Sequence, residues 1–260
     1  MLTEDISIEP VKYSANSLEV NVRGISMRHY VGNSRLRLWA ERMEDIEPEI
    51  LDWIDDFESG AVLYDLGASI GLFSIYAAIK AAARVVAFEP EAQNFATMEL
   101  NHYLNRERLH HPLVALNLAL SNMAGLGWIY CRFYGAGEHV KILDHSETRD
   151  TKERFRPEHA QAVIKQPLDK VVSEFNLPPP RYIKIDVDGS ELEVLLGAAK
   201  TLANPCVKSV FIELCKLEGG GAAEANILER LGFQLMRKVP VARLRGGVYP
   251  GLFNCVFMRD

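Results

Sequence analysis

The chain has 260 residues, of which 48% are hydrophobic and 25% charged, a composition typical of a folded globular protein and not of a fibrous or disordered one. Its net charge of −6, without a block of basic residues, argues against nucleic acid as a main partner and favours a small molecule. The four cysteines have no metal-binding spacing, and no run is long and apolar enough for a membrane span, so we expect reduced thiols, no zinc and no membrane segment.

The first 58 residues are predicted to form an N-terminal cap on a domain that comprises residues 59–260. The segment Met1–Asp5 is acidic where an export signal would be basic, which favours a cytoplasmic location. Apolar residues then recur at helical spacing between Glu44 and Phe57, which predicts a helix over 44–57.

From residue 61 onward, strand and helix patterns alternate. We predict strands at 61–66, 84–88, 113–120, 182–187 and 207–214, and helices at 72–83, 91–104, 169–175, 191–202 and 222–231. Short connections between them imply a doubly wound, mostly parallel α/β sheet with right-handed crossovers. Strands at 232–238 and 253–258 are predicted to form a terminal hairpin, joined by a basic loop around 243–247.

The alternation is interrupted between the third strand and the resumed pattern. Short strands are predicted at 128–134 and 162–168, with a polar stretch of about 135–160 between them that holds His139 and His145. A loop this long inside a compact domain is usually a lid or a binding segment. We therefore predict an inserted lid over the site.

A glycine turn between the first strand and its helix is the first functional signal. Gly67 and Gly71 allow a sharp turn and a close approach of the backbone to a ligand, and Glu89 ends the next strand about 20 residues later. At that spacing an acidic side chain binds ribose hydroxyls in dinucleotide-type folds. The glycine turn and Glu89 together indicate an adenosine-containing cofactor. The alternative is that the glycines form only a tight turn and that Glu89 is a solvated residue at the strand end.

The details of this turn favour one cofactor over another. It lacks the third glycine of the dinucleotide fingerprint, which disfavours an NAD(P)-dependent oxidoreductase. Asp65, at the strand end, would repel a phosphate but suit a cation. S-adenosylmethionine, which carries a sulfonium and an ammonium but no phosphate, fits better.

Four motifs in order, each at a strand end, resemble those of the FkbM family of S-adenosylmethionine-dependent methyltransferases: DLGASIGLF (65–73), AFEP (87–90), NLALS (117–121) and IKIDVDGSE (183–191). The resemblance covers about residues 61–215 and implies a class I, Rossmann-like, seven-stranded methyltransferase sheet. The family pattern usually has Asn where this chain has Ser69, and a Thr-Leu-Asp-Asp-like segment where it has 167–170.

The resemblance also implies which residues bind the cofactor. Asp65, Gly67 and Gly71 would line its methionine part and Glu89 would bridge the two ribose hydroxyls. Asn94 and Ala119 would lie near the adenine edge, and Asp186 beside the reaction centre. Ala68 and Pro90, inside two of the motifs, complete the predicted cofactor site. The alternative is that Asn94 is a polar surface residue and that Ala119 is a core alanine.

A second acidic cluster is expected at the strand that carries Lys184, Asp186 and Asp188. Alternation along the strand places these side chains on one face, near the strand end where open α/β sheets bind ligands. A structural ion pair of Lys184 with Asp186, and helix capping by Asp188, are the alternatives. A divalent metal held by Asp186, Asp188 and Glu213 is a less favoured interpretation, and no metal ligand is assigned.

These features predict O-methylation of a hydroxyl on a small metabolite such as a macrolide, a polyketide or a sugar. Asp186 is the predicted catalytic residue that orients the acceptor hydroxyl or takes its proton, and His139 in the lid is a second candidate base. A cofactor-binding module without turnover remains the non-enzymatic alternative. Nucleic acid and membrane are not expected as partners, whereas a homo-oligomer is compatible with the sequence.

Overall fold

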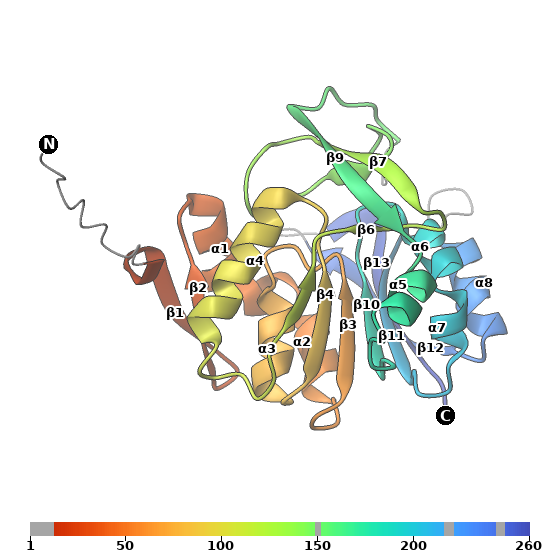
Figure 1. Ribbon diagram of the computed structural model, residues 1–260, viewed down its shortest axis with the longest axis horizontal. Coiled ribbons are helices and arrows are strands. Elements are labelled where there is room, and N and C mark those ends of the chain that lie inside the picture. Colours follow the sequence, from red (N-terminus) through yellow and green to blue (C-terminus); the bar gives the residue numbers. More distant parts are fainter. Residues whose placement is uncertain (1–12, 149–151, 216–220, 243–247) are drawn as a thin grey trace, which may run out of the picture.

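The computed structural model describes residues 13–148, 152–215, 221–242 and 248–260, and its centre is a seven-stranded mixed sheet with helices on both faces (Figure 1). From edge to edge the strands are β12 (Gln234–Ala242), β13 (Val248–Met258), β11 (Ser209–Cys215), β10 (Tyr182–Ile185), β3 (Val62–Leu66), β4 (Arg84–Phe88) and β5 (Val114–Leu116). The strands from β11 to β5 are parallel, whereas β13 is antiparallel to both of its neighbours. The predicted α/β sheet with a terminal hairpin is confirmed, and the hairpin makes the sheet mixed.

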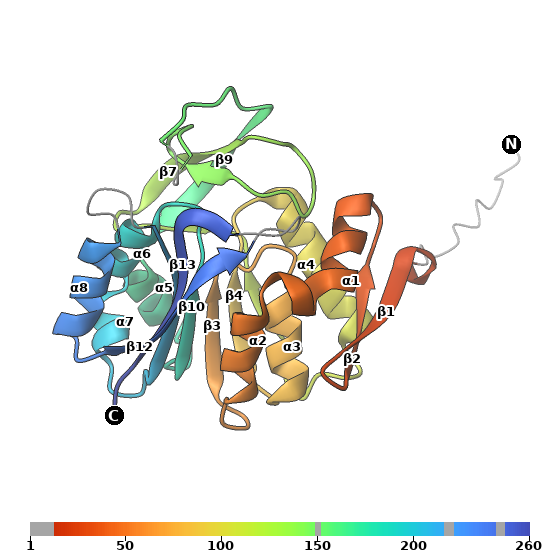
Figure 2. The ribbon, with the colours of Figure 1, turned by 180° about the vertical axis from the view of Figure 1, so that it is seen from behind.

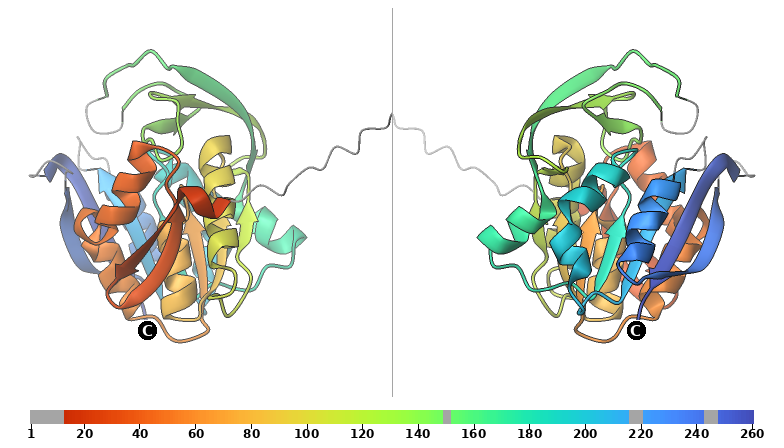
Figure 3. Two further views of the ribbon diagram at one scale, coloured as in Figure 1. Left: turned by 90° about the vertical axis from the view of Figure 1, so that its left-hand side faces the viewer. Right: turned by 90° about the vertical axis from the view of Figure 1, so that its right-hand side faces the viewer.

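Helices cover the two faces of this sheet in two groups (Figure 3). One face packs against α1 (Ser34–Ile46), α2 (Pro48–Asp55), α3 (Leu72–Lys80) and α4 (Ala92–Asn105), and the other against α5 (Leu168–Glu174), α6 (Glu191–Gly197), α7 (Ala199–Ala203) and α8 (Ala222–Arg230). Strand alternation explains both cores: on β4, Val85 and Ala87 enter the first, while Val86 and Phe88 enter the second. Within the described ranges, no helix has the length and apolar character that a membrane crossing requires.

Two predicted helices are each divided in the structure. The helix predicted over 44–57 is wrong in its extent, because α1 ends at Ile46 and α2 begins at Pro48. Proline has no N–H to continue the first helix and disfavours helical backbone at the preceding residue, so Glu47 adopts φ −138° and ψ 62°. The helix predicted over 191–202 is similarly broken at Ala198, between α6 and α7.

An N-terminal hairpin, which the sequence did not predict, precedes the helices of the cap. A short 3-10 helix, η1 (Tyr13–Asn16), leads into β1 (Ser17–Val22) and β2 (Ile25–Tyr30), whose two-residue turn has positive φ at both positions. Side chains of α4 bond the free edge of β2: Asn101 Oδ1 accepts from the N–H of Tyr30 at 2.7 Å, and Asn105 Oδ1 accepts from that of Arg28 at 2.8 Å. These bonds join the hairpin to the main domain.

The predicted lid is built on a second sheet and not on a single polar loop. Its order is β6 (Ala119–Leu120), β9 (His159–Gln166), β7 (Gly125–Cys131) and β8 (Lys141–Leu143), and it lies beyond one end of the central strands (Figures 1 and 2). The strand predicted over 113–120 is therefore two strands in two sheets, β5 and β6. The strands predicted at 128–134 and 162–168 both begin three residues earlier than expected. The predicted loop around 243–247 lies outside the described residues.

His29, on β2, is a buried histidine with no polar contact in the described part of the chain. Its side chain is 1% exposed, and neither ring nitrogen has a hydrogen-bond partner there. Burial lowers the pKa of His29 to about 4. The folded protein therefore holds this imidazole neutral at pH values where the unfolded chain protonates it.

This burial predicts a defined loss of stability in mild acid. A depressed histidine pKa contributes stability that is complete above the ordinary value of 6.5 and is lost as the pH falls from there towards 4. In urea unfolding, wild-type protein should lose about 2 kcal/mol more than His29→Leu between pH 7 and pH 5. An identical pH dependence in the two proteins would contradict the neutral, buried state.

Candidate active site

A cavity of about 490 Å³ lies at the carboxyl ends of the central strands, under the lid sheet. Strand order reverses between β3 and β10: the chain adds β4 and β5 on one side of β3 and then returns to place β10 and β11 on the other. Open α/β sheets bind ligands at such a reversal. The cavity walls come from the turn after β3, the ends of β4 and β10, the junction of α1 and α2, and the lid.

The glycine turn after β3 fits closely against the end of β10. Gly67 has φ +81°, and a Cβ at this position would lie 1.8 Å from the carbonyl oxygen of Asp186. The N–H groups of Gly67 and Ala68 donate to the carbonyl of Phe88 at 3.0 and 2.9 Å. Only glycine can hold the ends of β3, β4 and β10 this close together.

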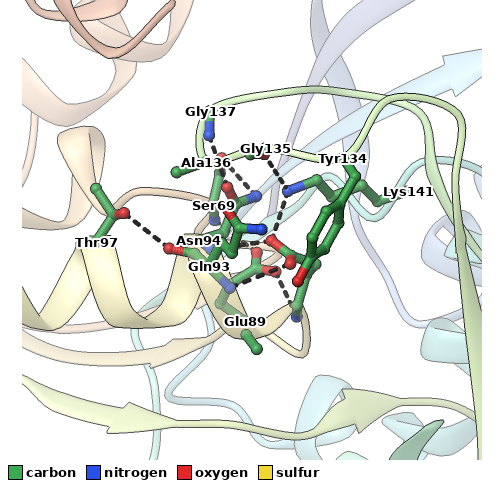
Figure 4. A network of polar contacts seen from close by, with 12 residues as sticks. Ser69, Glu89, Gln93, Asn94, Thr97, Tyr134, Gly135, Ala136, Gly137 and Lys141 are labelled. Carbon is green, nitrogen blue, oxygen red and sulfur yellow. Dashed lines mark hydrogen bonds and ion pairs between the residues drawn. The ribbon is translucent and has the colours of Figure 1, made fainter. Parts of the chain in front are cut away.

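Glu89, at the end of β4, is a buried carboxyl that lines the cavity. Its side chain is 6% exposed and accepts hydrogen bonds from the N–H groups of Ser69 and Glu91, both at 2.8 Å (Figure 4). Burial raises the pKa of Glu89 to about 7, although these two bonds and the charge of Lys141 act in the opposite direction. The glycine turn and the end of β4 are thus joined through this one side chain.

Polar contacts join the lid to the first turn of α4 (Figure 4). Lys141 Nζ lies 2.6 Å from Glu91 Oε2 and donates to the carbonyl of Gly135 at 3.1 Å. Glu91 also caps α4, by accepting from the N–H groups of Gln93 and Asn94. Asn94 Oδ1 accepts from the N–H of Gly137 at 2.8 Å. Because the Lys141–Glu91 pair is almost fully buried, loss of either partner would leave an uncompensated buried charge between the lid and α4.

The N-terminal cap holds the same lid segment from the other side. Trp39 Nε1 donates to the carbonyl of Gly137 at 2.9 Å, and Arg35 forms an ion pair with Glu138 at 3.1 Å. The N–H of Lys141 donates to Asp188 Oδ2 at 3.1 Å, which connects the lid to the loop after β10. The lid therefore closes the cavity through contacts to three separate parts of the fold.

Lys184 is a buried ammonium at the floor of the cavity. Its Nζ lies 3.1 Å from Asp65 Oδ1, 3.2 Å from the carbonyl of Gly67 and 3.8 Å from Asp186 Oδ2. Burial alone would lower the pKa of Lys184, but Asp65, Asp186 and Glu47 together hold it above its ordinary value. Asp65 also accepts from Ser74 Oγ at 2.6 Å. The ion pair of Lys184 with Asp186, which the sequence left as an alternative, is present together with this closer pair.

Glu47 is a cavity residue that sequence reasoning missed. It lies at the junction of α1 and α2, and it faces the cavity near Asp186 and Lys184. Enclosure by protein raises its pKa to about 8, with a further contribution from Asp186 and an opposing one from Lys184. The signal in the sequence was Pro48, which predicts that the helix is interrupted at this acidic residue.

His139 opens onto the cavity from the lid, as the sequence predicted. Its ring packs edge to face on Trp39, with the centroids 4.6 Å apart. The surrounding protein lowers its pKa, while Asp188 and Asp186 act in the opposite direction. The imidazole can therefore accept a proton from a group in the cavity.

Most of the predicted site residues line this one cavity: Gly67, Ala68, Glu89, Pro90, Asn94, Ala119, His139 and Asp186. Asp65 and Gly71 do not. Asp65 is 1% exposed and lies beneath the cavity against Lys184. Gly71 is the N-cap of α3, where a Cβ would lie 2.7 Å from the side chain of Met98. The individual roles of these residues remain predictions.

The carboxylates at the strand ends do not form a recognisable metal centre. Asp186, Asp188 and Glu213 all line the cavity, but the described residues include no group of three or more His, Cys, Asp or Glu side chains able to hold a metal ion. The metal alternative therefore has no support in this part of the chain.

Comparison with known proteins agrees with this fold. The chain resembles, over 78% of its length and with a TM-score of 0.53 at 16% identity, the crystal structure of a methyltransferase FkbM from Methylobacillus flagellatus, of which it covers 44%. That resemblance defines a Rossmann-like methyltransferase fold. The methyltransferase FkbM domain pattern matches residues 65–235, so the chain belongs to the FkbM methyltransferase family.

Two curated relatives extend this comparison. One is the AMB antimetabolite synthetase AmbE of Pseudomonas aeruginosa, which is 30% identical in an alignment of 206 positions that covers 67% of this chain and 10% of that protein. The other is the hexuronic acid methyltransferase AglP of Haloferax volcanii, 27% identical over 162 residues, 62% of this chain and 59% of that protein. The chain thus spans only part of the length of either relative.

The buried Lys141–Glu91 pair predicts that the lid contributes to stability. Lys141→Met leaves Glu91 as an uncompensated buried charge and should lower the free energy of unfolding by about 3 kcal/mol. Lys165→Met is the matched control on the same lid, because its partner Asp144 is 42% exposed whereas Glu91 is 1% exposed, so solvent can compensate the charge that is left. Its cost should stay below about 1 kcal/mol in the same urea titration. Equal losses of unfolding free energy in Lys141→Met and Lys165→Met would contradict the larger contribution of the buried pair.

Proposed function

We propose that this chain is an S-adenosylmethionine-dependent methyltransferase that methylates a hydroxyl oxygen of a small metabolite. The observation that carries the proposal is the convergence, in one cavity of an FkbM-family chain, of the glycine turn at Gly67 with the carboxyl of Glu89 and the carboxylate of Asp186. When bound, the cofactor supplies an electrophilic methyl group on a sulfonium.

The donors and acceptors of the cavity fit this cofactor better than a dinucleotide. Carboxyl oxygens such as those of Glu89 suit ribose hydroxyls and cationic groups. The ammonium nearest the glycine turn, Lys184, is already engaged by Asp65 and the carbonyl of Gly67, so it is poorly placed to bind a pyrophosphate. Calorimetry with S-adenosylhomocysteine and with NAD(P)H separates these two classes, and binding of NAD(P)H alone would refute the proposal.

Asp186 is the residue to which we assign the acceptor hydroxyl. Its side chain is 29% exposed towards the cavity, at 3.8 Å from the ammonium of Lys184. It can therefore orient a hydroxyl and accept its proton as the methyl group is transferred. His139, which lines the same cavity from the lid, is the second group able to take that proton.

We further propose that the acceptor is an acidic sugar or a similar hydroxylated acid. Three other cationic residues of the cavity lining each have a carboxylate partner: Arg35 with Glu138, Lys141 with Glu91 and Lys184 with Asp65. Arg132 also lines the cavity but forms no ion pair among the described residues. A guanidinium in this position suits a carboxylate on the acceptor, and the relative AglP is named as a hexuronic acid methyltransferase.

Turnover tests the role of Asp186 and the enzyme against a non-catalytic binding module. Asp186→Asn should lower the rate of S-adenosylhomocysteine formation with an acidic-sugar panel by about 100-fold, while the affinity for S-adenosylhomocysteine changes far less. The melting temperature serves as the control for folding. A fully active and normally stable variant would rule out this role.

Glu89 provides a test of cofactor placement that does not depend on the acceptor. Removing its carboxyl in Glu89→Ala should leave two ribose hydroxyls unpaired and weaken S-adenosylhomocysteine binding by roughly 30-fold or more. Glu89→Gln keeps one acceptor and should be milder. Unchanged calorimetric affinity in both variants would show that the ribose lies elsewhere.

A further inference from the structure

We propose that Glu47, supplied by the N-terminal cap, binds the α-ammonium group of the cofactor's amino-acid part, so that the cap completes the cofactor site. This inference rests on the proposed function and adds to it a residue outside the family motifs. It starts from the position of Glu47, whose side chain faces the cavity and forms no hydrogen bond among the described residues.

The backbone holds Glu47 firmly at this position. Its N–H donates to the carbonyl of Met43 at the end of α1, and its own carbonyl accepts from the N–H of Ile50 in α2. Each helix is anchored in turn: Trp39 of α1 bonds the lid, and Trp53 Nε1 of α2 donates to the buried Ser209 Oγ at 2.8 Å. A side chain fixed in this way is already placed to receive a ligand.

The charges around Glu47 call for a cation. Lys184 is the ammonium that faces Glu47, and it also serves Asp65 and Asp186, so three carboxyls share one positive charge. Glu49 adds further negative charge from α2. Without a ligand, burial favours the neutral form of Glu47, whose pKa is about 8. A second ammonium in the cavity would favour the carboxylate and release its proton.

The position of Glu47 and Lys184 in the cavity indicates which part of the cofactor would supply this cation. Gly67, whose carbonyl bonds Lys184 at 3.2 Å, belongs to the turn predicted to hold the methionine part, whereas Glu89 marks the ribose end. An amino-acid ammonium at the methionine end would therefore lie beside Glu47. Asp186, which also lies 3.8 Å from the ammonium of Lys184, is left to the acceptor.

Calorimetry with two ligands tests the inference. S-adenosylhomocysteine carries the α-ammonium, whereas 5′-methylthioadenosine keeps the adenosine and sulfur but lacks the amino-acid part. Glu47→Gln should weaken binding of the first by roughly 10- to 100-fold and of the second by less than about threefold. Glu41→Gln, the same change at an exposed position of α1 that does not line the cavity, should leave both affinities unchanged.

A proton count provides an independent readout. Titrations at pH 7 in two buffers of different ionisation enthalpy should show that wild-type protein releases up to about one more proton per S-adenosylhomocysteine than Glu47→Gln does. Glu89 and His139 also face the cavity and can exchange protons, so the difference between the two proteins is the relevant quantity.

The outcomes separate the inference from the proposal on which it rests. Equal affinities and equal proton counts in wild type and Glu47→Gln would overturn the inference, as would equal weakening of both ligands. Retained 5′-methylthioadenosine binding shows that Glu47→Gln is folded. If wild-type protein binds neither ligand, the proposed function itself fails.

Discussion

The buried ion pair between Lys184 and Asp65 is the interaction on which the rest of the site depends. It joins β10 to β3 at the place where the strand order reverses, and the two residues are direct partners in the register of the sheet. An ammonium with 5% exposure is tolerated only with compensating charge and hydrogen bonds, which Asp65 and the carbonyl of Gly67 provide. The glycine turn, Asp186 and Glu47 are all arranged around this one charge.

A second set of contacts joins regions that are far apart in the chain. The segment from Ala136 to Lys141 bonds Asn33, Arg35 and Trp39 on one side and Glu91 and Asn94 on the other. The N-terminal cap, the lid and the first turn of α4 therefore enclose the cavity together. Since Glu91 also follows Glu89, which bonds the glycine turn, the lid and the predicted ribose end of the site are only a few bonds apart. Such a closed arrangement suits a reaction that must exclude water.

Local patterns predicted the central sheet well because they depend on neighbouring residues only. Strand β4 has the bounds that the sequence predicted, and the turn at Gly67 follows from glycine's freedom at positive φ. The lid was harder to predict. Its strands pair residues that are far apart in the sequence, such as Gly125 with Lys165. The polar stretch between them has no local pattern that indicates this pairing. Pro48 is a local signal that a helix is interrupted. The helical spacing of apolar residues continues on both sides of it, however, so the sequence predicted one helix.

The sequence by itself determined the α/β alternation, the glycine turn, the acidic residue at the end of β4 and the resemblance to the FkbM family. These are set by short-range stereochemistry and by motifs whose chemistry is local. Tertiary structure decided what each carboxylate faces. It placed Asp65 beneath the cavity against Lys184, and it brought Glu47 from the N-terminal cap to the same ammonium. Charge and burial act through space, so only the folded chain shows which acidic groups share a cation.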